Sequence, residues 1–137
     1  ETKNSTQSPM EKSCVVLIDD EAEIRRIYTE HLEDEGYDVI AFDTAETALE
    51  AITAEPDKFD IALIDYNLPG MDGITLTRKI RLIRDSLAVI LISGYVKNPQ
   101  KKLQFLSDVD VIMTKPVELD QMTEVIKQTL HPELFEE

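Results

Sequence analysis

Five short apolar segments separated by longer amphipathic stretches restrict the fold of this chain more than any other feature of its sequence. The apolar segments span residues 14–18, 39–42, 61–64, 88–92 and 109–113, and each has the length of a single β-strand. Four of them are almost continuously apolar or β-branched, which is typical of strands covered on both faces. The sequence therefore predicts a sheet that is buried between two layers.

The stretches between these segments carry apolar residues at helical spacing. The first such stretch ends at Gly36, a residue type that commonly follows a helix. Asp43 is placed to cap the next helix, with Glu46 completing a box-like cap, and Asn98 before Pro99 predicts the start of another. Strands that alternate with helices predict repeated βαβ units, and hence a parallel sheet with helices on both faces.

Polar residues follow the predicted strands, at the edge where parallel sheets of this kind bind their ligands. Asp19 and Asp20 follow the first strand, Asp65 the third, Ser93 the fourth and Lys115 the fifth. Each motif alone has a plainer interpretation, such as a helix cap, a turn or a surface lysine. Their joint placement predicts that three carboxylates, one hydroxyl and one ammonium meet at one edge of the sheet.

This combination of groups points to a metal ion and a phosphoryl group. Three neighbouring carboxylates repel one another, and a divalent cation relieves that repulsion. Because the ligands are all oxygens, Mg²⁺ or Mn²⁺ is expected rather than zinc. Lys115 and Ser93 suit an anion, for which a phosphoryl group is the natural candidate beside a metal. A central carboxylate can then act as the nucleophile and form an aspartyl-phosphate.

Composition excludes several other classes of function. The net charge of −14 argues against direct binding of nucleic acid or anionic lipid, because both require a cationic surface. The apolar run that contains residues 88–92 is far shorter than a membrane span, so no membrane insertion is expected. Cys14 is the single cysteine, which favours a reducing, cytoplasmic location.

Taken together, the motifs resemble the receiver domain of two-component response regulators. They comprise the acidic pair Asp19–Asp20, Asp65 with the turn at 67–73, Ser93–Gly94 and Lys115–Pro116. The resemblance implies a flavodoxin-like α/β fold, with a doubly wound five-stranded parallel sheet in the strand order 2-1-3-4-5 and five helices. The receiver domain is expected at residues 13–130, between a flexible leader at 1–12 and a C-terminal tail at 131–137.

The resemblance also implies roles for single residues. Asp65 would be the phosphoacceptor, and Asp20, Asp65 and the backbone carbonyl of Asn67 would ligate Mg²⁺, with Asp19 acting through a metal-bound water. Ser93 and Lys115 would bind phosphoryl oxygens, Ser93 also serving as the switch.

A cis peptide bond is expected before Pro116. Tyr66 and Tyr95 flank the site and would modulate the lifetime of the phosphate. Ile112 departs from the pattern, because the family commonly has an aromatic switch residue there. The turn at 107–109 also departs from the usual Gly-Ala.

The partners implied are a histidine kinase or a histidine phosphotransfer protein as donor, and a downstream protein target or fused domain as recipient of the signal. A homodimer through the fourth helix, fifth strand and fifth helix is a further form of output that the resemblance allows. Such a domain catalyses only its own phosphorylation and dephosphorylation and is not a conventional enzyme.

Three alternatives remain at this stage. A degenerate receiver would act as an interaction module without phosphorylation, and Ile112 leaves this open for the output step. A haloacid-dehalogenase-like phosphatase also uses an aspartate nucleophile and Mg²⁺, but that group has a second aspartate where this chain has Asn67. A flavodoxin-like FMN carrier is disfavoured because Asp19 and Asp20 would repel the phosphate of the cofactor.

Overall fold

The computed structural model describes residues 12–94 and 98–135 of the chain. The expected leader, except for Lys12, and the expected modulating residue Tyr95 lie outside these ranges. Within them, no helix is both long and apolar enough to cross a membrane.

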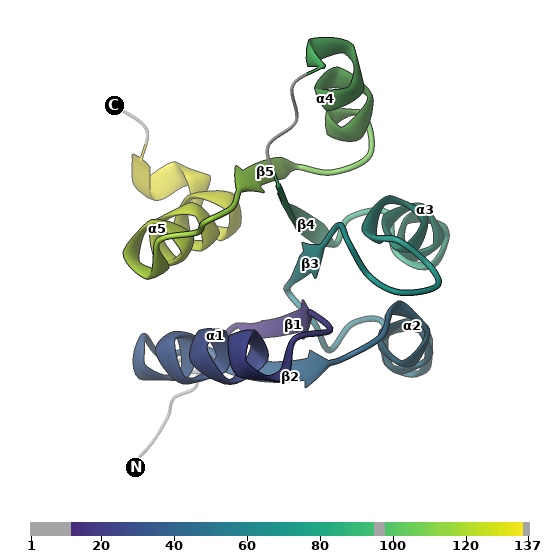
Figure 1. Cartoon of the computed structure of the whole chain (residues 1–137). Helices are drawn as coiled ribbons and strands as arrows, with labels where there is room; N and C mark the ends of the chain where they lie inside the picture. The colour runs from purple at the N-terminus through teal and green to yellow at the C-terminus, as the bar shows by residue number, and fades with distance from the viewer. Residues whose placement is uncertain (1–11, 95–97, 136–137) are drawn as a thin grey trace.

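The described residues form a parallel sheet enclosed by helices, as the sequence predicts (Figure 1). The strand order is β2-β1-β3-β4-β5, and every pairing of neighbouring strands is parallel. The elements in chain order are β1 (Cys14–Ile18), α1 (Ala22–Asp34), β2 (Asp38–Phe42), α2 (Ala45–Ala54), β3 (Ile61–Asp65), α3 (Gly73–Ile83), β4 (Ala88–Ser93), α4 (Pro99–Leu106), β5 (Val111–Thr114), α5 (Leu119–Leu130) and the 3-10 helix η2 (Pro132–Phe135).

Helices cover both faces of the sheet (Figure 1), and an apolar layer on each face holds them to it. Successive residues of a strand point to opposite faces, so Val15 and Leu17 of β1 pack with α1 and α5, whereas Val16 and Ile18 pack with α2 and α3. All five residues of β1 and of β3 are buried. The acidic residues Asp19 and Asp65 lie at the carboxyl ends of these two strands, after runs of buried apolar residues.

The helix termini agree with the sequence prediction at two places and differ at a third. Gly36 follows α1 with a φ of 98°, and the side chain of Asn98 accepts a hydrogen bond from the Gln100 N–H at the start of α4. The residue that caps α2 is Thr44 and not Asp43.

The Thr44 hydroxyl oxygen accepts a hydrogen bond from the backbone N–H of Thr47 at 3.1 Å. Asp43 lies one residue too early in the chain to reach that N–H group. Glu46 does not complete a cap box, because its carboxylate accepts instead from the backbone N–H of Met71 at 3.4 Å. The prediction therefore placed the helix start correctly within one residue but assigned the wrong cap.

The fifth strand starts at Val111, two residues later than the apolar segment predicts. Val109 belongs to the turn that closes α4, where its N–H donates to the carbonyl oxygen of Phe105 at 3.0 Å. Its side chain is buried in the same apolar layer as α2 and α3. Burial of a turn residue, rather than strand pairing, explains why this position is apolar.

Arginine side chains of α3 anchor the turn between α4 and β5, where the chain departs from the expected Gly-Ala. Arg78 contacts the Asp108 carboxylate at 3.1 Å, and Arg81 donates to the Asp108 carbonyl oxygen at 3.2 Å. Arg81 also contacts the Asp110 carboxylate, which in turn accepts from the Val89 N–H. The turn at 107–109 is thus fixed to α3 at the edge of the sheet opposite the strands' carboxyl ends.

The corrected cap of α2 leads to a first prediction. Replacing Thr44 by alanine should lower the free energy of unfolding by about 1 kcal/mol, because the Thr47 N–H loses its acceptor. Urea denaturation followed by circular dichroism measures the change. Asp43→Ala is the matched control and should cost clearly less. A larger loss in Asp43→Ala than in Thr44→Ala would contradict the assignment.

Candidate functional site

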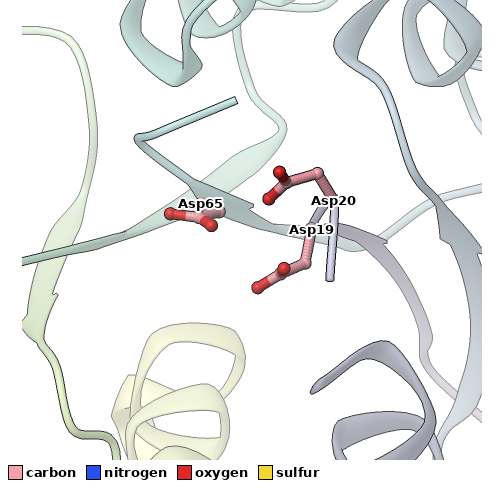
Figure 2. A group of neighbouring side chains, drawn as sticks. All are labelled: Asp19, Asp20 and Asp65. Atoms are coloured by element: carbon pink, nitrogen blue, oxygen red, sulfur yellow. The ribbon is translucent and has the colours of Figure 1, made fainter. Parts of the chain in front are cut away.

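Three carboxylates meet at the carboxyl ends of β1 and β3. Asp19, Asp20 and Asp65 each contribute one oxygen to a group of atoms that all lie within 4.8 Å of one another. Figure 2 shows Asp19 and Asp20, which directly follow β1, beside Asp65 at the end of β3. Asp19 and Asp65 are each 2% exposed, whereas Asp20 is exposed. The fold therefore brings together the acidic residues that the sequence placed at separate strand ends.

Backbone and side-chain hydrogen bonds hold Asp19 in place. Its N–H donates to the carbonyl oxygen of Phe42, continuing the pairing of β1 with β2. Its carbonyl oxygen accepts from the guanidinium of Arg25 at 2.8 Å, and its carboxylate accepts from the Glu21 N–H at 2.8 Å. The start of α1 is thereby tied to the acidic cluster by Asp19 itself.

Asp65 is the last residue of β3 and pairs with Ile92 of β4. Its carboxylate oxygen Oδ1 accepts from the Asn67 N–H at 3.1 Å and lies 3.1 Å from the Nζ atom of Lys115. Lys115 comes directly after β5, two strands away in the sheet, and its backbone N–H donates to the carbonyl oxygen of Ser93 at 2.8 Å. Lys115 thus connects the ends of β3, β4 and β5, through its side chain to Asp65 and through its backbone to Ser93.

The charges of the site do not balance within the described residues. Burial raises the pKa of the Asp19 carboxyl; the hydrogen bond from Glu21 opposes this shift, and the negative charge of Asp65 adds to it. Burial alone would lower the pKa of Lys115, but the hydrogen bond and charge of Asp65, with the charges of Asp19 and Glu21, outweigh it and raise that pKa. The positive charges of Lys115 and of Arg25, which bonds the Asp19 carbonyl oxygen, are thus fewer than the four carboxylates of Asp19, Asp20, Glu21 and Asp65.

An excess of buried negative charge with an all-oxygen donor set is consistent with a divalent metal site. Asp19 and Asp65 are buried carboxylates that each have further lone pairs available beyond the hydrogen bonds described. Hard, oxygen-seeking cations match this donor set, because the cluster contains neither a thiolate nor an imidazole.

The loop between β3 and α3 is shaped by its backbone. The carbonyl oxygen of Tyr66 accepts from the N–H groups of both Leu68 and Gly73, each at 3.1 Å. Gly70 adopts a φ of 75°, a conformation that glycine allows without strain. Asn67, whose N–H donates to Asp65 Oδ1, therefore lies at the start of a loop that backbone hydrogen bonds hold closed.

The remaining residues singled out by the sequence lie around this cluster. Ser93 ends β4, is buried and pairs with Thr114. The peptide bond between Lys115 and Pro116 is cis. Ile112 is partly buried and packs, like Tyr66, against the apolar layer of α2 and α3.

The structure adds residues that sequence reasoning did not single out for the site. A cavity of about 500 Å³ adjoins the acidic cluster, between α1 and the segment that joins β5 to α5. Its lining comprises Asp19, Glu21, Ile24, Ile27, Tyr28, Lys115, Pro116, Val117 and Leu119. Tyr28 fits the apolar spacing of α1. No signal in the sequence distinguishes it from the other residues of that face.

Comparisons with known proteins agree with this geometry. Residues 15–127 match the response regulator receiver domain family. The transcriptional regulatory protein AruR of Pseudomonas aeruginosa is 42% identical over 84 residues, covering 58% of this chain and 34% of that protein. Sporulation initiation phosphotransferase F of Bacillus subtilis is 28% identical over 120 residues, covering 85% of this chain and 92% of that protein.

A solved response regulator receiver domain protein (CheY-like) from Methanospirillum hungatei superimposes with a TM-score of 0.81. It is 29% identical, and the match covers 93% of this chain and 100% of that one. The chain therefore spans almost the whole length of some relatives but only about a third of AruR.

The close packing of Gly73 against the backbone of Asp65 leads to a second prediction. A methyl group at Gly73 would lie 2.8 Å from the carbonyl oxygen of Asp65 and 3.0 Å from the side chains of Ile64 and Leu91. Gly73→Ala should therefore lower the free energy of unfolding by about 1–3 kcal/mol, because the backbone of Asp65 must shift. Urea denaturation measures the loss. Gly94→Ala is the control, since its methyl group would meet no atom within 4 Å, and equal losses in the two variants would refute the argument.

Proposed function

The chain belongs to the response regulator receiver domain family, and from this membership we propose that it accepts a phosphoryl group on Asp65 and passes the signal on through protein contacts. The observation that carries the proposal is the contact of Lys115 Nζ with Asp65 Oδ1 at 3.1 Å beside two further carboxylates. A buried carboxylate between an ammonium and an acidic cluster is suited to receive a phosphoryl group and to balance its charge. The domain is a signalling module rather than a conventional enzyme.

In the proposed transfer, an Oδ atom of Asp65 forms a bond to phosphorus while the P–N bond of a phosphohistidine breaks. The electron pair of the broken bond leaves with the imidazole nitrogen of the donor. Asp65 loses its own negative charge in this step, so the ammonium of Lys115 can pair with a phosphoryl oxygen instead. The hydroxyl of Ser93 donates to another phosphoryl oxygen. Hydrolysis reverses the state, because attack of water on phosphorus releases phosphate and restores the carboxylate.

Mg²⁺, with Mn²⁺ as an alternative, is the proposed cation of the acidic cluster. Asp20, Asp65 and the carbonyl oxygen of Asn67 would hold it directly, and Asp19 through a water molecule. The excess of carboxylates over ammonium groups supports this assignment. When bound, the ion supplies neutralisation of the negative charge on the transferring phosphoryl group.

The proposed receiver domain covers residues 13–130, with residues 131–137 as a tail. A histidine kinase or a histidine phosphotransfer protein is the proposed phosphoryl donor, and a protein target or a fused domain the recipient of the signal. Two relatives, a sporulation initiation phosphotransferase and a transcriptional regulatory protein, support such a place in a relay. A homodimer through α4, β5 and α5 is a further form that this output could take. Tyr66 and Tyr95 are proposed to tune the lifetime of the phosphate.

The phosphoacceptor assignment is tested by intact mass spectrometry after incubation with acetyl phosphate or phosphoramidate and Mg²⁺. The wild-type chain should gain the mass of one phosphoryl group, and Asp65→Asn should gain none, because the amide is not a nucleophile of comparable strength. Asp43→Asn is the matched control and should be labelled like the wild type. Labelling of Asp65→Asn, or none of the wild type with either donor, would contradict the proposal.

The cation assignment is tested by thermal unfolding. Mg²⁺ should raise the Tm, because a ligand that binds only the folded state stabilises it by RT ln(1 + [L]/Kd), about 2.7 kcal/mol at a concentration 100-fold above Kd. Asp20→Asn should reduce this rise, whereas Asp120→Asn, an exposed carboxylate on α5, should leave it unchanged. An equal rise in all three proteins would indicate a general salt effect and contradict a site at the cluster.

A further inference from the structure

The turn that closes helix α4 is fixed to α3, but the described side chains of the helix itself contribute little to the core. Among the α4 side chains that the structure describes, Phe105 alone is buried, at 7% exposed. Leu103 and Leu106 on the same helix are 66% and 41% exposed. The cap of α4 is local, since the Asn98 side chain accepts from the N–H of Gln100 and its carbonyl oxygen from the N–H of Lys102, both within the first turn of the helix. Between its two ends, the position of α4 therefore depends on what Phe105 packs against.

Phe105 packs against Tyr66, the residue that directly follows Asp65. Their ring centroids lie 5.0 Å apart, with an angle of 41° between the ring planes, a separation typical of favourable aromatic pairs. The Nζ atom of Lys101, on the same helix, lies 5.8 Å from the Phe105 ring centroid, within the range of a cation–π contact. The ring of Phe105 is thus placed between its own helix and the candidate site.

The backbone of Tyr66 is joined firmly to the candidate site. Its N–H donates at 2.8 Å to the carbonyl oxygen of Ile92, the residue before Ser93, and its carbonyl oxygen accepts from Leu68 and Gly73. Movement at the ends of β3 or β4 must therefore move the backbone of Tyr66. Because the Tyr66 ring contacts Phe105, a shift of the Tyr66 backbone also shifts this contact with α4.

From these contacts we infer that the Tyr66–Phe105 pair transmits occupancy of the acidic site, by a divalent cation and a phosphoryl group, to the docking of α4. The inference rests on the proposed phosphoacceptor function. A helix with a single buried anchor lies at the low end of local stability, so a small displacement of the anchor's partner shifts its population. The rings are already in contact and Phe105 is already buried. Displacement of Tyr66 therefore loosens α4.

Ile112 takes no part in this link. It packs on the same apolar layer as Tyr66 and Phe105, but it is aliphatic and lies on β5. The aromatic contact between the site and α4 is complete without it. This separates the inferred link from a switch based on an aromatic residue at position 112.

Hydrogen–deuterium exchange of the α4 backbone tests the inference, with phosphoryl incorporation measured by intact mass in the same samples. In the wild type, acetyl phosphate with Mg²⁺ should speed exchange in α4 by at least about five-fold, the lower end of typical coupling between two sites. Tyr66→Phe keeps the ring and should retain the response. Tyr66→Leu and Phe105→Leu remove one ring each and should lose it. Ile112→Val, a matched change in the same layer, should retain it.

The outcomes separate the inference from the function on which it rests. If the mass shows phosphorylation but exchange in α4 is unchanged or slower, or if Tyr66→Leu responds like the wild type while folded by circular dichroism, the inference is overturned. If no protein is phosphorylated, the proposed function fails. The same comparison with saturating Mg²⁺ as the occupant then decides the inference, which is upheld by a response that depends on Tyr66 and overturned by its absence.

Discussion

The ion pair between Lys115 and Asp65 is the interaction on which the rest of the site depends. Two carboxylates, those of Asp19 and Asp65, are buried at neighbouring strand ends, and a buried charge is costly unless it is paired. Lys115 supplies one positive charge, and it can do so only because β5 lies two strands from β3 in a fully parallel sheet. The remaining negative charge makes the site receptive to a cation. The order of the strands therefore determines which charged side chains can meet at the site.

Close packing around Asp65 gives this pairing its geometry. Gly73 approaches the carbonyl oxygen of Asp65 so closely that any side chain there would displace it, and Tyr66 is bonded to both β4 and the loop that follows. The backbone that carries the Asp65 carboxylate therefore has little freedom to relax. In the proposed transfer, preorganised charges of this kind would stabilise the phosphoryl group without reorganisation at the moment of reaction. The glycine is part of the site although it offers no functional group.

The two ends of the sheet differ in how firmly their elements are held. At the end away from the acidic cluster, Arg78 and Arg81 of α3 fix the turn before β5 with several polar contacts to Asp108 and Asp110. Helix α4, just before that turn, rests on Phe105 alone among its described side chains. Because the turn before β5 is firmly held and α4 is weakly held, a conformational change is expected to be confined to α4. Under the proposed function, phosphorylation of Asp65 would then change one surface of the domain and leave its core intact.

The sequence by itself determined the order and type of the elements, the parallel sheet and the identity of the polar residues at its carboxyl edge, because these follow from local periodicity and from the chirality of βαβ units. It misplaced the cap of α2 and the start of β5, since Asp43 and Thr44 are both good caps and a buried turn residue such as Val109 is as apolar as a strand residue. Only the tertiary structure decided the contacts between residues far apart in the chain. The pairing of Lys115 with Asp65, the cavity beside Tyr28 and the stacking of Tyr66 on Phe105 depend on distances that no local pattern encodes, because packing of whole elements sets them.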